Sequence, residues 1–100
     1  MRHRGEVDET ALEELDLYAE NTGELYNQKK SILENIRRRL KNGTYSAVLA
    51  PKLWMFWVES AAKRYGKEFG TSSRVDAIFN LPTREALARR LAKRYESGSE

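Results

Sequence analysis

The sequence predicts an all-α protein, a compact domain of four helices in which the third helix is apolar and central. Three observations lead to this prediction. Apolar side chains recur at helical spacing in four segments, and glycine, proline or capping residues stand where these segments begin or end. A chain of 100 residues is also long enough for one hydrophobic core but not for two.

The first helix is expected at about residues 10–21. Thr10 and Glu13 have the spacing of a capping box, in which each side chain satisfies a free amide at the start of a helix. Leu12, Leu15, Tyr18 and Ala19 recur at helical spacing, with acidic residues on the other side. The helix is expected to stop in a turn at residues 21–23, where Gly23 tolerates a left-handed cap.

The second helix is expected at about residues 24–41, with Gly43 just past its end. One face of this segment is apolar, and the other carries lysine, arginine and glutamate side chains. The following residues, 42–46, are typical of a turn. Ser46 is predicted to cap a short helical turn at 47–50.

The third helix is expected at about residues 51–69. It contains six consecutive apolar residues, 53–58, a run that taken alone would also suit a buried strand. The alanines that follow, and the spacing of Trp57, Ala61 and Tyr65, favour a helix. Because its first turns are apolar all round, we expect this helix to be covered on several sides.

An irregular stretch is expected from Gly70 to about residue 82, with one short helical turn at 74–79 packed against the core. The last helix is expected at about 83–96, with Thr83 as a candidate cap. Residues 10–96 then form a single helical domain. Residues 1–9 and 97–100 are expected to be flexible ends.

Composition restricts the chemistry of this protein. There is no cysteine and a single histidine, His3, so thiolate chemistry and a histidine metal site are excluded, and we expect no cofactor and no bound metal. No apolar stretch is long enough for a membrane span, and the start of the chain leads into acidic residues rather than an apolar signal region. We therefore expect a cytoplasmic protein with no membrane partner.

The net charge of +3 is unevenly distributed. Residues 1–24 carry a net charge of −6 and residues 25–100 a net charge of +9. Basic residues cluster on the second helix, late on the third and on the fourth, and such arrays are typical of phosphate-backbone binding. The alternative is that they are solvated faces, some of them paired with the acids of the first helix. Five residues are the candidate nucleic-acid contacts: Arg38, Lys41, Arg90, Lys93 and Arg94.

Two further groups of residues are candidate binding or catalytic sites. The aromatic side chains Trp54, Phe56 and Trp57 suit either the core or self-association through an open face of the third helix. Glu59 is the one acid in apolar company, but a salt bridge to Lys63, four residues on, explains it better than catalysis. No catalytic residue is predicted, and we do not expect an enzyme.

One further pattern covers about residues 13–96. It consists of the segments 14–15, 17–18, 20–26, Asn35, 43–45, Ala50, 52–54, 61–63, 65–70 and 83–84. Residues at helix ends and turns are prominent in it, among them Asn21, Gly23 and Gly43. In these segments the chain resembles a family of small helical proteins encoded on bacteriophages, prophages and plasmids. The resemblance implies an accessory protein of the bacterial cytoplasm; it implies no reaction, because the family has no established activity.

Two functions stay open at this point. The first is a protein-interaction module that uses the acidic first helix or an open face of the third. This hypothesis predicts a basic surface broken up by internal ion pairs, together with an exposed apolar patch. The second is a non-specific nucleic-acid-binding protein, which predicts that the five candidate contacts converge on one face.

Overall fold

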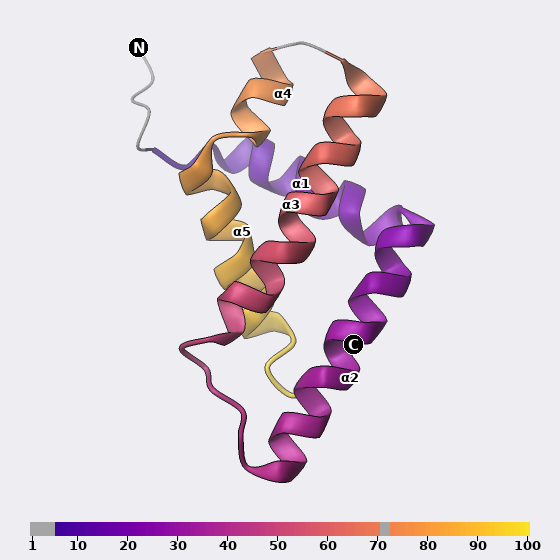
Figure 1. The fold of residues 1–100 in the computed structure, drawn as a ribbon. Helices are drawn as coiled ribbons and strands as arrows, with labels where there is room; N and C mark the ends of the chain where they lie inside the picture. The colour runs from indigo at the N-terminus through magenta and orange to yellow at the C-terminus, as the bar shows by residue number, and fades with distance from the viewer. Residues whose placement is uncertain (1–5, 71–72) are drawn as a thin grey trace.

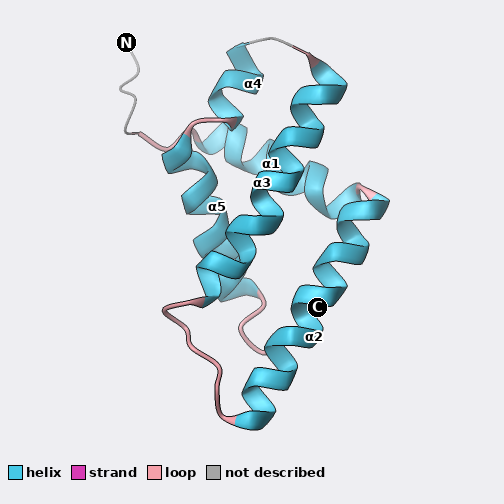
Figure 2. Cartoon of the chain, viewed as in Figure 1, coloured by secondary structure: helices cyan, strands magenta, loops and turns pink. Residues whose placement is uncertain are grey.

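The computed structural model describes residues 6–70 and 73–100, and every regular element in this part of the chain is a helix (Figure 1, Figure 2). The all-α prediction is confirmed. The number of helices is five rather than four, because the helical turn expected at 74–79 forms a separate six-residue helix. Residues 1–5, which include His3, and residues 71 and 72 of the expected irregular stretch lie outside the described residues. The helices are α1 (Glu9–Asn21), α2 (Gly23–Asn42), α3 (Ala50–Phe69), α4 (Ser73–Ile78) and α5 (Leu81–Arg94).

Helix α1 begins one residue earlier than expected, and its cap is Asp8 rather than Thr10. The Asp8 carboxylate accepts a hydrogen bond from the amide of Ala11 at 3.1 Å, which satisfies one of the free amides of the first turn. Thr10 lies inside that turn and is exposed. The helix ends at Asn21 because Thr22 is extended, with φ −102° and ψ 120°.

Gly23 was expected to adopt a left-handed conformation, but it is the first residue of α2 and has no positive φ. The turn between α1 and α2 therefore depends on Thr22, whose hydroxyl donates to the carbonyl of Tyr18 at 2.7 Å. The predicted end of α2 is confirmed. Gly43 has φ 73°, and its amide donates to the carbonyls of Arg39 and Leu40.

A loop of residues 43–49 leads from the far end of α2 back to α3 (Figure 2). Ser46 caps the turn at the end of this loop, as predicted, because its hydroxyl accepts from the amide of Leu49 at 3.3 Å. Helix α3 then contacts each of the other four helices and packs most extensively against α5. Its side chains Trp54, Trp57 and Val58 are fully buried.

The first turns of α3 are not enclosed all round as expected. Phe56 is 81% exposed, although it lies in the middle of the apolar run. A helix presents only part of its circumference to its neighbours, so six consecutive apolar residues cannot all face the core, and Phe56 lies on the side that the other helices leave open.

Thr83 was expected to cap the last helix, but α5 begins at Leu81 with Asn80 as its cap residue. The buried Thr83 hydroxyl instead accepts from the amide of Asp8 at 3.0 Å. The Asn80 side chain donates to the carbonyl of Glu6 at 2.8 Å. These two bonds attach residues 6–8 to the start of α5.

The other end of the chain returns to α2. Gly98 is buried, has φ 77°, and its carbonyl accepts from Arg37 Nη1 at 2.6 Å. Nearby, the ammonium group of Lys29, which is only 4% exposed, pairs with Glu20 at 3.3 Å. Glu20 also accepts from the hydroxyl of Tyr95 at 2.6 Å, so this polar group joins α1, α2 and the residue after α5.

Candidate functional site

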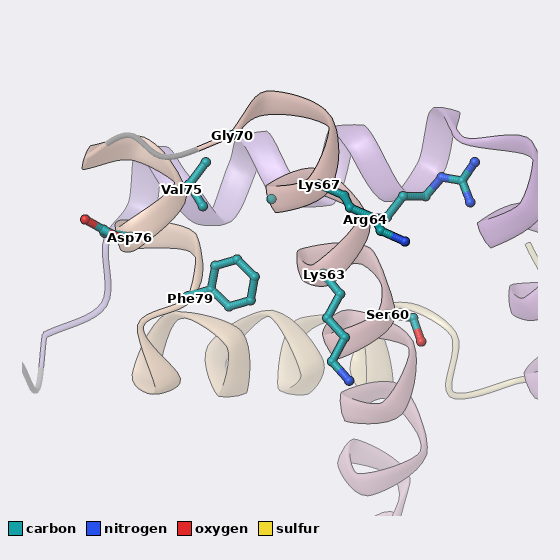
Figure 3. A pocket seen from close by; sticks show the side chains of 9 residues that line it. Ser60, Lys63, Arg64, Lys67, Gly70, Val75, Asp76 and Phe79 are labelled. Atoms are coloured by element: carbon teal, nitrogen blue, oxygen red, sulfur yellow. The ribbon is translucent and has the colours of Figure 1, made fainter.

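The side of α3 that the other helices leave open carries one long trough. A hollow of about 780 Å³ lies between the second half of α3 and α4 (Figure 3). A second hollow of about 280 Å³ lies along the first half of α3 and shares Ser60 and Lys63 with the first. We call the two together the α3 trough. Its lining residues are Lys52, Met55, Phe56, Glu59, Ser60, Lys63, Arg64, Gly66, Lys67, Gly70, Val75, Asp76 and Phe79.

The floor of the α3 trough is a stripe along one face of the helix. Lys52, Phe56, Ser60, Lys63 and Lys67 are spaced at i, i+4, i+8, i+11 and i+15, so they line one side over about four turns. At a rise of 1.5 Å per residue, this stripe is about 22 Å long. Three of its five side chains are lysines.

Helix α4 supplies the wall of the larger hollow. The ring of Phe79, just after α4, faces the α3 side of the hollow in Figure 3. Gly66 permits this approach, because a Cβ atom at that position would lie 2.9 Å from Cε2 of Phe79. Phe79 remains 38% exposed. The trough therefore has an accessible aromatic ring near each end, Phe79 at one and Phe56 at the other.

The trough is basic because its lysines are unpaired. Lys52, Lys63 and Lys67 are exposed and have no ion-pair partner within residues 6–70 and 73–100. The other charges at its edges are mostly neutralised. Arg64 donates to Glu24, and Arg84 Nη1 lies 3.2 Å from Glu59 Oε1. Asp76 is the remaining acidic side chain of the lining.

The pairing of Glu59 corrects one expectation. Its partner is Arg84 of α5 rather than Lys63, so the acid joins two helices instead of two turns of one helix. Lys63 is thereby left free to face the trough. Among the described residues no group of three or more histidine, cysteine or acidic side chains is placed to hold a metal ion.

Most acidic side chains of α1 form ion pairs with basic side chains of the same molecule. These acids pair with basic residues from α2, α4 and α5, which confirms the interpretation that they serve as internal partners. Asp16 accepts two hydrogen bonds from the Arg94 guanidinium, of 2.7 and 3.0 Å. These hydrogen bonds are the largest cause of the raised pKa of Arg94. The other pairs are Glu9 with Arg90, Glu14 with Arg74 and Glu20 with Lys29.

The structure divides the five candidate nucleic-acid contacts between two helices, α2 and α5, whose backbones do not lie next to each other. Arg38 and Lys41 lie in the last turns of α2, exposed and without an ion-pair partner in the described part of the chain. Lys93 of α5 is likewise exposed and unpaired there. Arg90 and Arg94 point to α1, where Glu9 and Asp16 hold them.

The sequence left Phe56 open between the core and an exposed face of the third helix and did not single out Lys52 as a site residue, although both line the trough. A signal for them was present. Lys52, Ser60, Lys63 and Lys67 are polar or charged at one helical spacing, and Phe56 falls on the same stripe. An aromatic residue on an otherwise polar stripe is the pattern of an exposed anchor rather than of a core residue.

None of the described helices combines the length and hydropathy of a membrane-spanning segment. Comparisons with protein families, with characterised proteins and with solved structures find no match to this chain.

Proposed function

We propose that this protein is a small protein-interaction module, and that it binds a partner protein through the α3 trough. The observation that carries the proposal is the exposed ring of Phe56 between unpaired lysines. Phe56 is 81% exposed and forms the apolar part of the trough together with Met55 and Phe79, and an exposed apolar patch with a polar rim is typical of a protein-interaction site. A rigid aromatic anchor in a hollow with a polar rim is the usual anatomy of an interface hot spot.

The charge of the trough selects the partner. Lys52, Lys63 and Lys67 lack acidic partners in the described chain, whereas Arg64 and Arg84 at the edges have them. A partner segment with acidic residues around an apolar centre would complement both the lysines and the two phenylalanines. A second copy of this chain fits poorly, because pairing α3 with α3 would bring the unpaired lysines together.

The biological setting belongs to the same proposal. The resemblance to phage, prophage and plasmid proteins implies an accessory protein that acts in the bacterial cytoplasm. We propose that its partner is a protein of the host or of the mobile element itself. A binding role rather than catalysis is supported by Glu59, whose carboxylate is engaged by Arg84.

Nuclear magnetic resonance with designed probes tests the proposal. Two acidic peptides of about 16 residues are titrated into the ¹⁵N-labelled protein, one with apolar residues at helical spacing and the other with the same residues in strict alternation. We expect at least one of them to shift the amides of residues 52–67. If neither peptide shifts these amides, the trough is not a protein-binding site and the proposal fails.

Two matched variants locate the binding surface. Phe56→Ser removes the trough anchor, and Leu17→Ser removes a comparably exposed apolar residue of α1, which is 66% exposed. Both variants should stay folded, since neither side chain is in the core. Only Phe56→Ser should weaken binding, by about 30-fold if Phe56 is a hot spot. Equal effects of the two variants would show that the peptide binds without using the trough.

The second candidate function is nucleic-acid binding, favoured by the unpaired cations at Arg38, Lys41 and Lys93. Fluorescence anisotropy with labelled single-stranded DNA, duplex DNA and RNA between about 50 and 200 mM salt tests it. Binding that weakens steeply with salt, and is lost in the Arg38→Glu/Lys41→Glu variant, would replace the protein-interaction proposal if the peptides also fail. No binding at low salt removes this alternative.

A further inference from the structure

We infer that the partner segment in the α3 trough is a single amphipathic helix of about four turns, which lies along α3 and is anchored at Phe56 and Phe79. This inference rests on the proposed function and adds the shape and pattern of the partner. It follows from the length of the trough, the backbone around it and the position of its charges.

The length of the trough matches one short helix. The stripe from Lys52 to Lys67 spans about 22 Å, which is the length of about 15 residues of α-helix. Phe56 lies one turn from the first end of this stripe. Phe79 lies against Gly66, close to the other end. A partner helix with apolar residues at i, i+4, i+7 and i+11 would place them along the line between the two rings.

The backbone around the trough favours a helix over an extended peptide. An extended peptide gains affinity by adding a strand to an exposed sheet edge, where its amides and carbonyls find partners. The walls of the trough are α3, α4 and Phe79 just after α4, and helices use their amides and carbonyls internally. A helical partner satisfies its own backbone and presents only side chains to α3, as helices do when they pack on one another.

The lysines set the pattern of the polar face. Lys63 and Lys67 are one turn apart and line the larger hollow, while Lys52 lies at the far end of the smaller one. Acidic residues flanking both ends of the partner's apolar stripe would meet them. Helix α1 from a second copy does not supply this pattern, because four of its acids are paired internally and its apolar side chains Leu12, Leu15 and Ala19 are buried.

The two probe peptides introduced above separate this inference from the proposed function. The peptide with helical spacing should bind at least 10-fold more tightly than the alternating peptide, as measured by isothermal titration calorimetry. Circular dichroism should show that it gains helix on binding. A proline at its centre, which breaks a helix, should weaken its binding by about 100-fold.

Each outcome decides between the two claims. If the alternating peptide binds the trough as tightly as the helical one, or if the proline has no effect, the helical partner is refuted while the proposed function stands. If neither peptide shifts residues 52–67, both are refuted.

Charge reversals supply the control for specific binding. Lys63→Glu/Lys67→Glu and Lys41→Glu/Lys93→Glu change the net charge of the protein by the same amount, but only the first pair lies in the trough. We expect the first variant to bind the helical peptide at least about 10-fold more weakly than the original protein, and the second variant to change the affinity by less than about 3-fold. Equal losses would show that the acidic peptide responds only to net charge, and would refute the docking site.

Discussion

Two neighbouring tryptophans of α3 differ in one hydrogen bond, and this difference predicts unequal effects of the same substitution. Trp54 and Trp57 are both fully buried, at 0% and 1% exposure, and their rings contact each other with centroids 5.5 Å apart. The Trp57 indole N–H donates to the carbonyl of Leu25 at 2.7 Å. The Trp54 indole N–H has no hydrogen-bond partner among the described residues.

Replacing each tryptophan by phenylalanine removes the same atoms from the same helix. The loss of apolar volume is therefore similar and largely cancels when the two variants are compared. Trp57→Phe also loses a hydrogen bond worth about 1 kcal/mol. The unpartnered indole N–H of Trp54 destabilises the original protein by about 1–3 kcal/mol, and Trp54→Phe recovers this free energy by removing the N–H. Trp57→Phe should thus be less stable than Trp54→Phe by about 2–4 kcal/mol.

Urea denaturation followed by circular dichroism measures this difference. The denaturation slopes of the two variants should agree, so that the midpoints report the free energy of unfolding directly. In a thermal scan of a domain of this size the gap is roughly 10 °C or more. Equal stabilities, or a lower stability for Trp54→Phe, would show that the Leu25 hydrogen bond does not stabilise the packing of α2 on α3.

The remaining predictions concern α2 and the end of the chain that packs against it. Gly98→Ala should destabilise the fold by about 1–2 kcal/mol, because the φ of Gly98 is 77° and a Cβ atom would lie 2.5 Å from Cγ of Arg37. Gly23→Ala adds its methyl group in open space in the first turn of α2 and should stabilise the fold by up to about 1 kcal/mol. Thermal unfolding measures both effects, and a Gly98→Ala variant as stable as the original protein would contradict the packing of Gly98 on Arg37. Burial raises the pKa of Tyr95 above its ordinary 10.0. At Lys29 burial lowers the pKa, but the charges and hydrogen bonds of Glu20 and Tyr95 together outweigh burial, so the Lys29 pKa is also raised from 10.5. Both groups hold their protons more tightly in the folded state, so their stabilisation is complete below about pH 10 and is lost as the pH rises further; urea midpoints should fall there, and less steeply in Tyr95→Phe.

The helices themselves were predictable, because periodicity and turn residues are local signals. The end of α2 at Gly43 and the turn at Ser46 followed from the sequence for this reason. The caps of α1 and α5 did not. Thr10 and Thr83 both have the chemistry of a cap, but which residue caps a helix depends on where the chain enters it, and Asp8 and Asn80 occupy those positions.

The partners of the charged residues were the least predictable part. Glu59 has Lys63 at the favourable spacing of four residues on its own helix, yet Arg84 of α5 is its partner. The burial of Lys29 is a similar case, because a lysine enters a core only where an acid such as Glu20 accompanies it. Such pairs join segments far apart in the sequence, so their choice is decided by helix packing. The charge of the α3 trough depends on one such choice, because Lys63 is unpaired where Glu59 pairs with Arg84 instead.

Gly66 connects the fold to the proposed site. It lies against the ring of Phe79, and alanine there would place a Cβ atom 2.9 Å from Cε2 and 3.2 Å from Cζ of that ring. The nearest atoms belong to the end of a partly exposed side chain, which can turn aside without moving backbone. Alanine also favours the helix by up to about 1 kcal/mol over glycine.

Gly66→Ala should therefore leave the free energy of unfolding within about 1 kcal/mol of its original value while displacing Phe79 in the trough. If Phe79 anchors the partner helix, the helical peptide should bind this variant several-fold more weakly, and Phe79→Ala should weaken it at least as much. The Gly23→Ala variant, which adds a methyl group in open space on α2, is the control and should bind normally. Unchanged peptide affinity in Gly66→Ala and Phe79→Ala would restrict the anchor to Phe56. The partner would then cover only the first half of α3, and the four-turn helix would be too long.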